Sequence, residues 1–430
     1  SKLTRVSKPF SCPIFNWASS TAAELIDTAV LGQVNSKWVA AQAAVNAFLG
    51  SFAWVFNFLS YGPTAQIGQK VGEGKTTSVG IYIRLAILTA FGLGLCFSLV
   101  LFGGRNFLLQ HFLGAQPPLL EAAIPYWNIR VLGYPLTLTA MALVGVLRGL
   151  QQIKVVMVAV FTMTVINGLG SYLSVFHWDF GLQGVAFSTV LSFLVCNLIL
   201  IISLLKKSKE VGLFKRSNES LQAVFHFGKD AFHLTVRTAF LSLAFFILVL
   251  FATRLGSDIL AAHQIMLQLW LLASFTMDGF AVTANSIGAK LIGQKRFSDH
   301  FILCKRLLVL GCSMGFCLSF CYMIAQTPIL YFFSKDMNLH AKLKDLWFFL
   351  ILTQPMNGIL YVLDGVLFGC RQFSDLRNAV FYGFCFVFTP LLVFSYFVDL
   401  QFTYLWYCLF SLNMFRLLFG LLVFQKNKRD

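Results

Sequence analysis

Charged side chains are scarce in this sequence. Only 12% of its 430 residues are Asp, Glu, Lys or Arg, whereas 58% are hydrophobic. Soluble globular domains typically carry about 25% charged and about 45–50% apolar residues, so a water-solvated surface of ordinary size is excluded. Uninterrupted apolar runs, such as VLSFLVCNLILIISLL at 190–205, are typical of helices solvated by lipid and by one another. The composition predicts an all-α polytopic membrane protein embedded in the lipid bilayer.

Motifs for metal binding and for catalysis are also lacking. The ten cysteines are spread along apolar segments without a CxxC pair or a Cys/His cluster, which disfavours both a disulfide framework and a zinc site. There is no HExxH motif, no paired-aspartate protease motif and no Ser/His dyad at helical spacing. We therefore predict no enzyme activity, no catalytic residue, no resident metal and no cofactor. An intramembrane enzyme remains a remote alternative.

Acidic residues are outnumbered, since 33 Lys and Arg face 17 Asp and Glu and the formal net charge is +16. The cations gather in alternate connections between the apolar segments, most densely in KKSKEVGLFKR at 206–216. This alternation is the positive-inside pattern of a multi-pass protein and does not indicate a nucleic-acid-binding surface. It predicts a protein of the inner (plasma) membrane with both termini in the cytoplasm and no nucleic-acid partner.

The breaks between the apolar segments divide the chain into twelve predicted transmembrane helices. They lie near 12–32, 38–62, 79–102, 118–147, 153–176, 181–205, 230–253, 257–287, 301–325, 342–369, 374–397 and 401–424.

The sequence repeats itself at an offset of 220 residues. PLTLTAMALVGVLRGLQQIK, from Pro135, matches PMNGILYVLDGVLFGCRQFS, from Pro355, and TAQIGQKVG at 64–72 matches TANSIGAKLIG at 283–293. Each repeat holds six spans, so the two halves insert with the same orientation, related by a pseudo-two-fold axis along the membrane normal. The predicted units are an N-lobe at 1–205, a cytoplasmic linker at 206–229 and a C-lobe at 230–430. Such a duplication is typical of transporters that work by alternating access; a duplicated scaffold without transport is the alternative.

Two carboxylates interrupt the first predicted span, in TAAELIDTAVLGQ at 21–33. Glu24, Asp27 and Thr28 have i, i+3, i+4 spacing and therefore share one helical face. An ionised carboxylate near the bilayer centre costs about 2.5–3.5 kcal/mol even on lenient scales, so such residues face a cavity or a partner. The repeat places Leu248 and Phe251 opposite the two carboxylates, so the fold itself does not require acids there. They are candidates for a coupled proton carrier or a Na⁺ ligand, although Glu24 could simply be hydrated at the helix mouth.

Other polar residues lie within the predicted spans. Asn167 and Ser171 are one turn apart in the fifth span, where a bond between helices without function is as plausible as ligand binding. Asp278 and Asp364, in the second half, are expected to form a separate polar cluster with Arg237 as a possible counter-charge. The first half is therefore the candidate coupling region.

Several ordered motifs carry a resemblance to a known family. LIDTAVLG, TAQIGQKVGEG, RLGSDILAA, MDGFA and LDGVLFGCRQFSDLRN together resemble the multidrug and toxic compound extrusion (MATE) family, and its DNA-damage-inducible protein F (DinF) branch in particular. The resemblance implies an antiporter of two six-helix lobes that expels cationic or amphipathic organic compounds against H⁺ or Na⁺. The family's first-helix acid falls on Asp27 and its fifth-helix Asn on Asn167. Many relatives carry Asp where this chain has Ser171, so Glu24 is expected to replace that missing acid.

The sequence thus predicts a monomeric, H⁺-coupled antiporter for small organic substrates, with Asp27 as the principal proton carrier. Na⁺-coupled efflux is an alternative, with Na⁺ held at Asp27 and Asn167. A lipid or lipid-linked precursor flippase of the same superfamily is another. A flippase normally needs a strongly cationic cleft, and the four arginines within predicted spans are scattered over four of them: Arg84, Arg130, Arg237 and Arg416.

Overall fold

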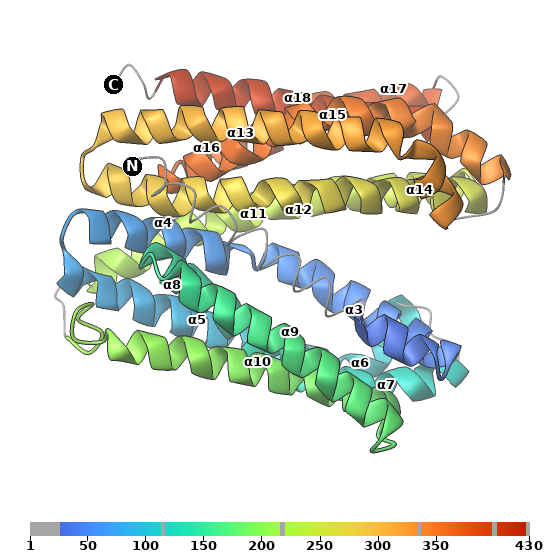
Figure 1. The fold of residues 1–430 in the computed structure, drawn as a ribbon, viewed down its shortest axis with the longest axis horizontal. Helices are drawn as coiled ribbons and strands as arrows, with labels where there is room; N and C mark the ends of the chain where they lie inside the picture. The colour runs from blue at the N-terminus through green and yellow to red at the C-terminus, as the bar shows by residue number, and fades with distance from the viewer. Residues whose placement is uncertain (1–25, 113–116, 216–219, 334–336, 398–401, 427–430) are drawn as a thin grey trace. The chain divides into compact units, whose positions relative to one another are not determined.

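The computed structural model describes residues 26–112, 117–215, 220–333, 337–397 and 402–426, and every regular element in these ranges is a helix. Contacts divide the chain into two compact units, of which the first ends at Ala231 and the second begins at Phe232, inside helix α11. Figure 1 labels the helices of both units.

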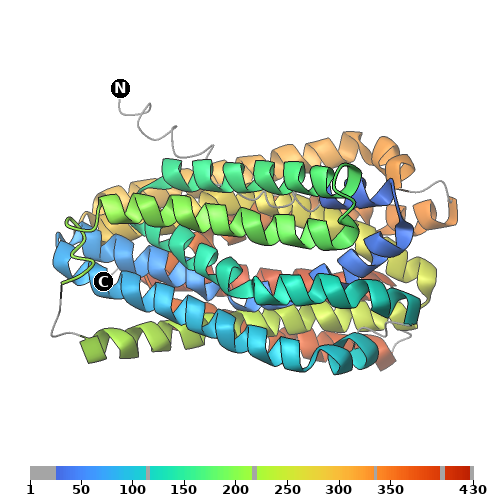
Figure 2. The ribbon, with the colours of Figure 1, turned by 90° about the horizontal axis from the view of Figure 1, so that it is seen from below.

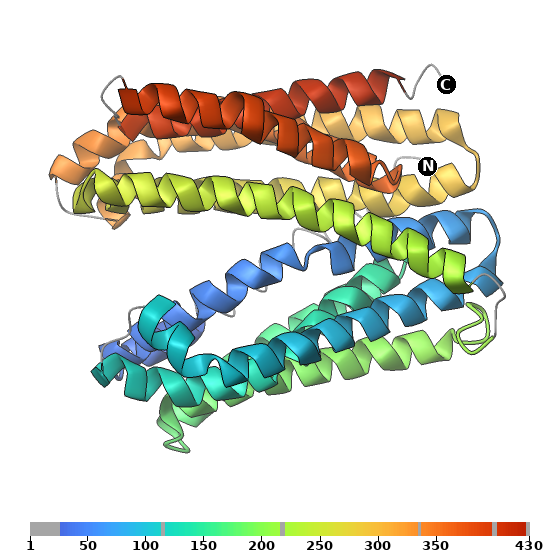
Figure 3. The ribbon, with the colours of Figure 1, turned by 180° about the vertical axis from the view of Figure 1, so that it is seen from behind.

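Residues 26–32 form the first described helix of the first unit. The helices that follow are α3 (Ser36–Val55), α4 (Phe58–Gly72), α5 (Thr76–Gly103), α6 (Arg105–Phe107), the π-helix η1 (Leu108–Phe112), α7 (Pro117–Leu132), α8 (Tyr134–Gly149), α9 (Ile153–Phe176) and α10 (Gly181–Lys206). The remaining helices are α11 (Ser220–Arg254), α12 (Ser257–Gly293), α13 (Phe297–Ile324), α14 (Gln326–Phe333), α15 (Met337–Gly369), α16 (Phe373–Gly383), the π-helix η2 (Phe384–Phe388), α17 (Thr389–Phe397) and α18 (Phe402–Lys426). Figure 3 shows α11 from behind as one continuous helix.

Ten helical spans in the described part of the chain are long and apolar enough to cross a membrane, and the bent pair α7 and α8 gives an eleventh. These spans confirm the prediction of an all-α polytopic membrane protein. The predicted fifth span coincides with α9, whereas the predicted eighth span stops at 287 and α12 continues to Gly293. The predicted first span, 12–32, lies mostly outside the described residues.

The internal repeat is visible in the contacts that glycines make within each unit. A Cβ on Gly145 of α8 would meet the backbone of Ser60 in α4 closer than real Cβ atoms approach, so the two helices cross with their backbones in contact. The repeat-related Gly365 of α15 makes the same contact with the backbone of Ala281 in α12. The matched sequence motifs therefore encode the same helix crossing twice.

This crossing gives a stability prediction. Gly145→Val should lower the free energy of unfolding by about 1–3 kcal/mol, because the added side chain has backbone on its far side and must push α4 away. Thermal unfolding of the purified protein in detergent measures the effect. Gly92→Val is the matched control, since Gly92 also lies within a helix of the first unit but has open space around its Cβ position. Equal losses in the two variants would contradict the assignment.

The two units differ in how continuous their equivalent helices are. In the first unit a turn at 56–57 separates α3 from α4, and α7 and α8 are bent by 43° around Gly133. The corresponding α12 and α15 run unbroken for 37 and 33 residues. Proline alone does not explain the bend, because Pro355 lies inside the continuous α15. At Gly133 the missing side chain leaves room for Val190 of α10.

Helices α9 and α10 run side by side, as Figure 2 shows in green. Their contact uses small residues on both sides: Gly170 of α9 lies against Ser188 of α10, and Gly184 of α10 lies against Ser174 of α9. The hydroxyls of Ser174 and Ser188 are 3.2 Å apart. This tight pairing fixes the rotation of α9 and so determines which of its polar side chains point away from α10.

Candidate functional site

A buried hydrogen-bonded cluster joins residues 26–32 to α9 in the first unit. Asp27 Oδ1 accepts a hydrogen bond of 3.0 Å from Asn167 Nδ2 and one of 2.6 Å from Ser171 Oγ. The exposed fractions are 3% for Asp27, 2% for Asn167 and 0% for Ser171. We call these three residues the Asp27 cluster. A carboxylate at such burial requires strong hydrogen-bond donors, and both donors converge on one of its oxygens.

The backbone of α9 brings the cluster together. Asn167 and Ser171 are one turn apart and lie on the same face, and Gly168 lies beside them. A Cβ on Gly168 would be 3.3 Å from the side chain of Ile26, so the helix of residues 26–32 packs directly on the α9 backbone at this point. The neighbouring Asp27 is thereby held within hydrogen-bond distance of the two α9 side chains.

The polar atoms of the cluster are not all satisfied. Asn167 Oδ1 is buried and has no hydrogen-bond partner, although the Nδ2 of the same amide donates to Asp27. A buried acceptor without a partner is costly and marks a place where a proton donor or a cation would be stabilised. The cluster therefore brings together the carboxylate of Asp27, the hydroxyl of Ser171 and the Oδ1 of Asn167, which has no hydrogen-bond partner.

The predicted coupling site also included Thr28 and Glu24. Thr28 is exposed whereas Asp27 is buried, so the two side chains lie in different environments although they were expected to share one helical face. Glu24 lies outside the described residues, and its suggested partnership with Asp27 stays a prediction. The residues that the structure brings together are Asp27, Asn167 and Ser171.

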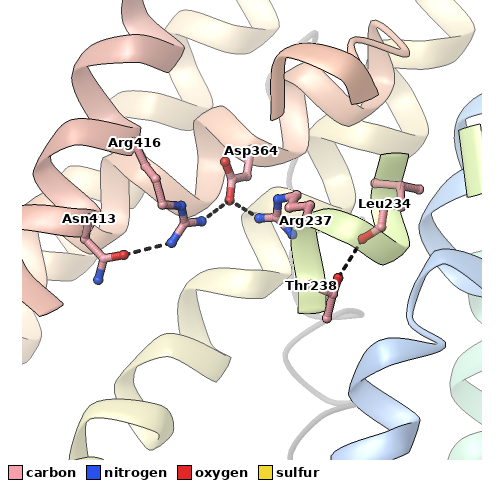
Figure 4. A network of polar contacts seen from close by, with 6 residues as sticks. All are labelled: Leu234, Arg237, Thr238, Asp364, Asn413 and Arg416. Atoms are coloured by element: carbon pink, nitrogen blue, oxygen red, sulfur yellow. Dashed lines mark hydrogen bonds and ion pairs between the residues drawn. The ribbon is translucent and has the colours of Figure 1, made fainter. Parts of the chain in front are cut away.

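The second unit contains a separate network of charged residues. Asp364 Oδ2, on α15, is 2.5 Å from Arg237 Nη2 of α11 and 2.7 Å from Arg416 Nη2 of α18. Arg416 also donates to Asn413 Oδ1 at 2.8 Å. Figure 4 shows Asp364 between the two guanidinium groups. All three charged side chains are largely buried, with exposed fractions of 6–12%.

The expected pairing of Asp364 with Arg237 is present, but the sequence interpretation missed Arg416. Its signal was available: Arg416 was one of the four arginines within predicted spans, and an arginine at that depth needs a partner. Asp278, predicted to share this cluster, is half-buried on α12 and lies within electrostatic range of Tyr361, as Asp364 does. Asp364 thus connects α15 to α11 and α18, and Asp278 of α12 lies nearby.

Comparison with known families and proteins gives a consistent result. The model of the MatE family matches residues 14–173 and 234–396. Protein DETOXIFICATION 43 of Arabidopsis thaliana is 33% identical over 269 residues, which cover 62% of this chain and 50% of that protein. DNA damage-inducible protein F of Escherichia coli (strain K12) is 24% identical over 366 residues, covering 83% and 78%. The chain spans about half the length of the Arabidopsis relatives DETOXIFICATION 43 and 42.

Solved structures share the fold. A MOP superfamily transporter from Pyrococcus furiosus aligns with a TM-score of 0.85 at 16% identity, over 99% of this chain and 94% of that one. The Vibrio cholerae MATE transporter VcmN in its bent form aligns with a TM-score of 0.86 at 15% identity, over 99% and 96%. At these identities the likeness concerns the arrangement of the helices.

Proposed function

The chain belongs to the MatE family, whose members are membrane transporters rather than enzymes, and from this premise we propose that it is an H⁺-coupled antiporter. It would export organic cationic or amphipathic compounds by alternating access. We further propose that it acts as a monomer in the plasma membrane. The gathering of the cations in alternate connections supports an orientation with both termini in the cytoplasm.

The observation that carries the proposal is the Asp27 cluster. In the ionised state, the carboxylate of Asp27 is stabilised by the donors from Asn167 and Ser171. In the protonated state it needs acceptors, and the same partners can supply them. The Ser171 hydroxyl can accept as well as donate, and rotation of the Asn167 amide would present its unused Oδ1. The cluster can thus hold Asp27 in both charge states, which a proton carrier requires.

Proton binding would also change the contact between two helices. Both hydrogen bonds run from α9 to the helix of residues 26–32, so reversing their direction alters how strongly these segments are held together. An alternating-access transporter needs such a link between ion binding and helix contacts, because an ion shifts a conformational equilibrium only through its different affinity for the two states.

Na⁺ is the competing coupling ion, and its ligands would be oxygens of the same three side chains. Among the described residues, no group of three or more His, Cys, Asp and Glu side chains is placed to hold a metal ion. Among the described residues, a Na⁺ site would use the carboxylate of Asp27 with neutral oxygens from Asn167 and Ser171. This set of oxygens also suits a monovalent cation, so the choice between H⁺ and Na⁺ is made by the transport measurement.

Transport by the purified chain in liposomes tests the proposal. We expect efflux of a fluorescent organic cation such as ethidium to follow an imposed pH gradient and to be unaffected by an imposed Na⁺ gradient at constant pH. Protein-free liposomes and a protonophore are the controls for passive leakage. Efflux that follows only the Na⁺ gradient would replace H⁺ by Na⁺ as the coupling ion, and efflux that follows neither gradient would overturn the antiport mechanism.

A further inference from the structure

The first part of the predicted linker is a folded loop that follows α10. We call residues 207–215 the linker loop; Figure 1 shows it at the end of α10, beside the start of α5. Its turns are closed by backbone hydrogen bonds, from Val211 N to Lys207 O at 3.1 Å and from Leu213 N to Ser208 O at 3.0 Å. The linker loop is therefore a structured part of the first unit and not a loose tether.

Helix α5 anchors this loop through Arg84. The guanidinium donates hydrogen bonds to the carbonyl oxygens of Leu213 at 2.9 Å and of Lys215 at 3.1 Å. About one turn earlier on α5, a Cβ on Gly80 would collide with the carbonyl oxygen of Gly212, so the two backbones are in direct contact. An arginine within a predicted span thus has its partners in the backbone of the linker loop.

These contacts determine the depth of the linker loop in the membrane. The apolar span of α5 begins at Val79, so Gly80 and Arg84 both lie in its first two turns. Two turns extend about 11 Å along a helix axis. The headgroup region on each side of the hydrocarbon core is about 5–7 Å thick. The linker loop therefore lies at the level of the lipid headgroups.

The linker loop holds an aromatic side chain away from the protein. Phe214 lies between the two residues whose carbonyls Arg84 binds, and its side chain is 76% exposed. Val211 and Leu213 are buried, so the apolar residues of the loop do not all point outward. Aromatic rings are favourable at the level of the headgroups, where they reach the boundary with the acyl chains. The position of Phe214 thus favours contact with lipid.

Unpaired lysines accompany this aromatic side chain. Lys206, Lys209 and Lys215 are exposed, and none of them forms an ion pair with any residue that the structure describes. Lys207 is 3.8 Å from Glu210, and this pair leaves the net charge of the segment positive. Several cations beside a membrane span attract anionic headgroups, and their contributions accumulate. The charge of the segment is therefore complementary to an anionic lipid surface.

We propose that the linker loop binds anionic phospholipid. Phe214 enters the boundary between headgroups and acyl chains, and the ammonium groups of Lys206, Lys209 and Lys215 pair with the phosphates. Bound lipid would then hold the linker loop at the membrane surface, where the chain leaves α10. This inference goes beyond the proposed transport function, because it depends neither on the coupling ion nor on the substrate.

A photo-reactive analogue of phenylalanine tests the proposal at the site itself. p-Benzoylphenylalanine replaces Phe214 in the purified full chain, in nanodiscs of equal amounts of phosphatidylglycerol and phosphatidylcholine with the same acyl chains. Irradiation cross-links the analogue to its neighbours, and mass spectrometry identifies the adducts. We expect phosphatidylglycerol to exceed phosphatidylcholine by about fivefold or more. The matched control is the same analogue in place of Phe187, an exposed residue of α10 without a lysine in the adjacent turns, where the two lipids should be labelled equally.

The contribution of the lysines is measured in the chain that carries the analogue at position 214. Lys206→Gln, Lys209→Gln and Lys215→Gln together should bring the ratio of the two lipids to about one. Lys154→Gln should leave the ratio unchanged, because it removes an exposed charge at the start of α9. If the triple variant fails to fold, salt provides a second test. Raising NaCl from about 0.1 M to about 1 M shortens the Debye length from about 10 Å to about 3 Å, which should lower the ratio at position 214 only.

Equal labelling of the two lipids at position 214, or an excess of phosphatidylglycerol that survives both the triple substitution and high salt, would overturn the site. Lipid adducts at position 187 but not at 214 would show that the linker loop faces water. Adducts of position 214 with a second copy of the chain would identify a protein contact instead; both results would overturn the proposal. No ion gradient is used, so failure of the lipid site leaves the antiport mechanism standing, and failure of gradient-driven efflux leaves the lipid site standing.

Discussion

Asp27→Asn should abolish efflux driven by a pH gradient while the protein still folds and inserts. The amide is nearly isosteric with the carboxylate and keeps a carbonyl oxygen that can accept from Asn167 Nδ2 and Ser171 Oγ, so the packing between residues 26–32 and α9 is retained. What the amide cannot do is gain and lose a proton. Proteoliposomes with an imposed pH gradient measure the loss, which we expect to reach the level of protein-free liposomes.

A matched control separates this effect from a general loss of acidic charge. Asp179, between α9 and α10 in the same unit, is exposed and has a backbone φ of 52°, a conformation that Asn also tolerates. Asp179→Asn should transport like the wild type. Ser171→Ala should reduce proton-driven efflux without abolishing it, because one of the two donors to Asp27 remains. Wild-type efflux by Asp27→Asn would refute Asp27 as the proton carrier.

The sequence predicted the helices well where a span has polar or glycine-containing breaks at both ends. The segment of α9 is bounded in this way, and its predicted and observed limits coincide. The break between α3 and α4 was not predictable, because the flanking residues are apolar and the equivalent α12 is continuous. Local sequence does not determine such a break; it depends on which neighbouring helices pack against the segment.

The candidate site, like the fold, was predictable from the sequence only in part. Asp27, Asn167 and Ser171 were found because a polar side chain in an apolar span needs a partner, and that cost can be recognised without a structure. The link between Arg416 and Asp364 was missed, because 52 residues separate them and no short-range pattern indicates which faces of α15 and α18 meet. A cavity of about 190 Å³ among α4, α8, α9 and α10 was also missed, since a void depends on how side chains from four helices fill space.

The largest stability effect is expected for Asp364→Asn in the second unit. This change leaves the guanidinium groups of Arg237 and Arg416 buried without their shared carboxylate. Removing one partner from a buried ion pair typically costs about 3–5 kcal/mol, because the remaining charge stays desolvated. Thermal unfolding in detergent should show a correspondingly large loss. Asp299→Asn is the control, since Asp299 forms an exposed pair with Arg296 in the same unit and such pairs contribute about 0–1 kcal/mol.

The origin of this loss of stability can be tested by removing one of the two guanidinium groups that Asp364→Asn leaves without a carboxylate. Arg416→Met in the Asp364→Asn background should recover part of the stability, because one buried guanidinium is replaced by an apolar side chain of similar length. Arg416→Met alone should cost less than Asp364→Asn alone, since Asp364 keeps its contact with Arg237. The two substitutions should therefore be strongly non-additive. Additive losses would show that the three charges do not act as one network, and that Asp364 stabilises the second unit through contacts other than its two arginines.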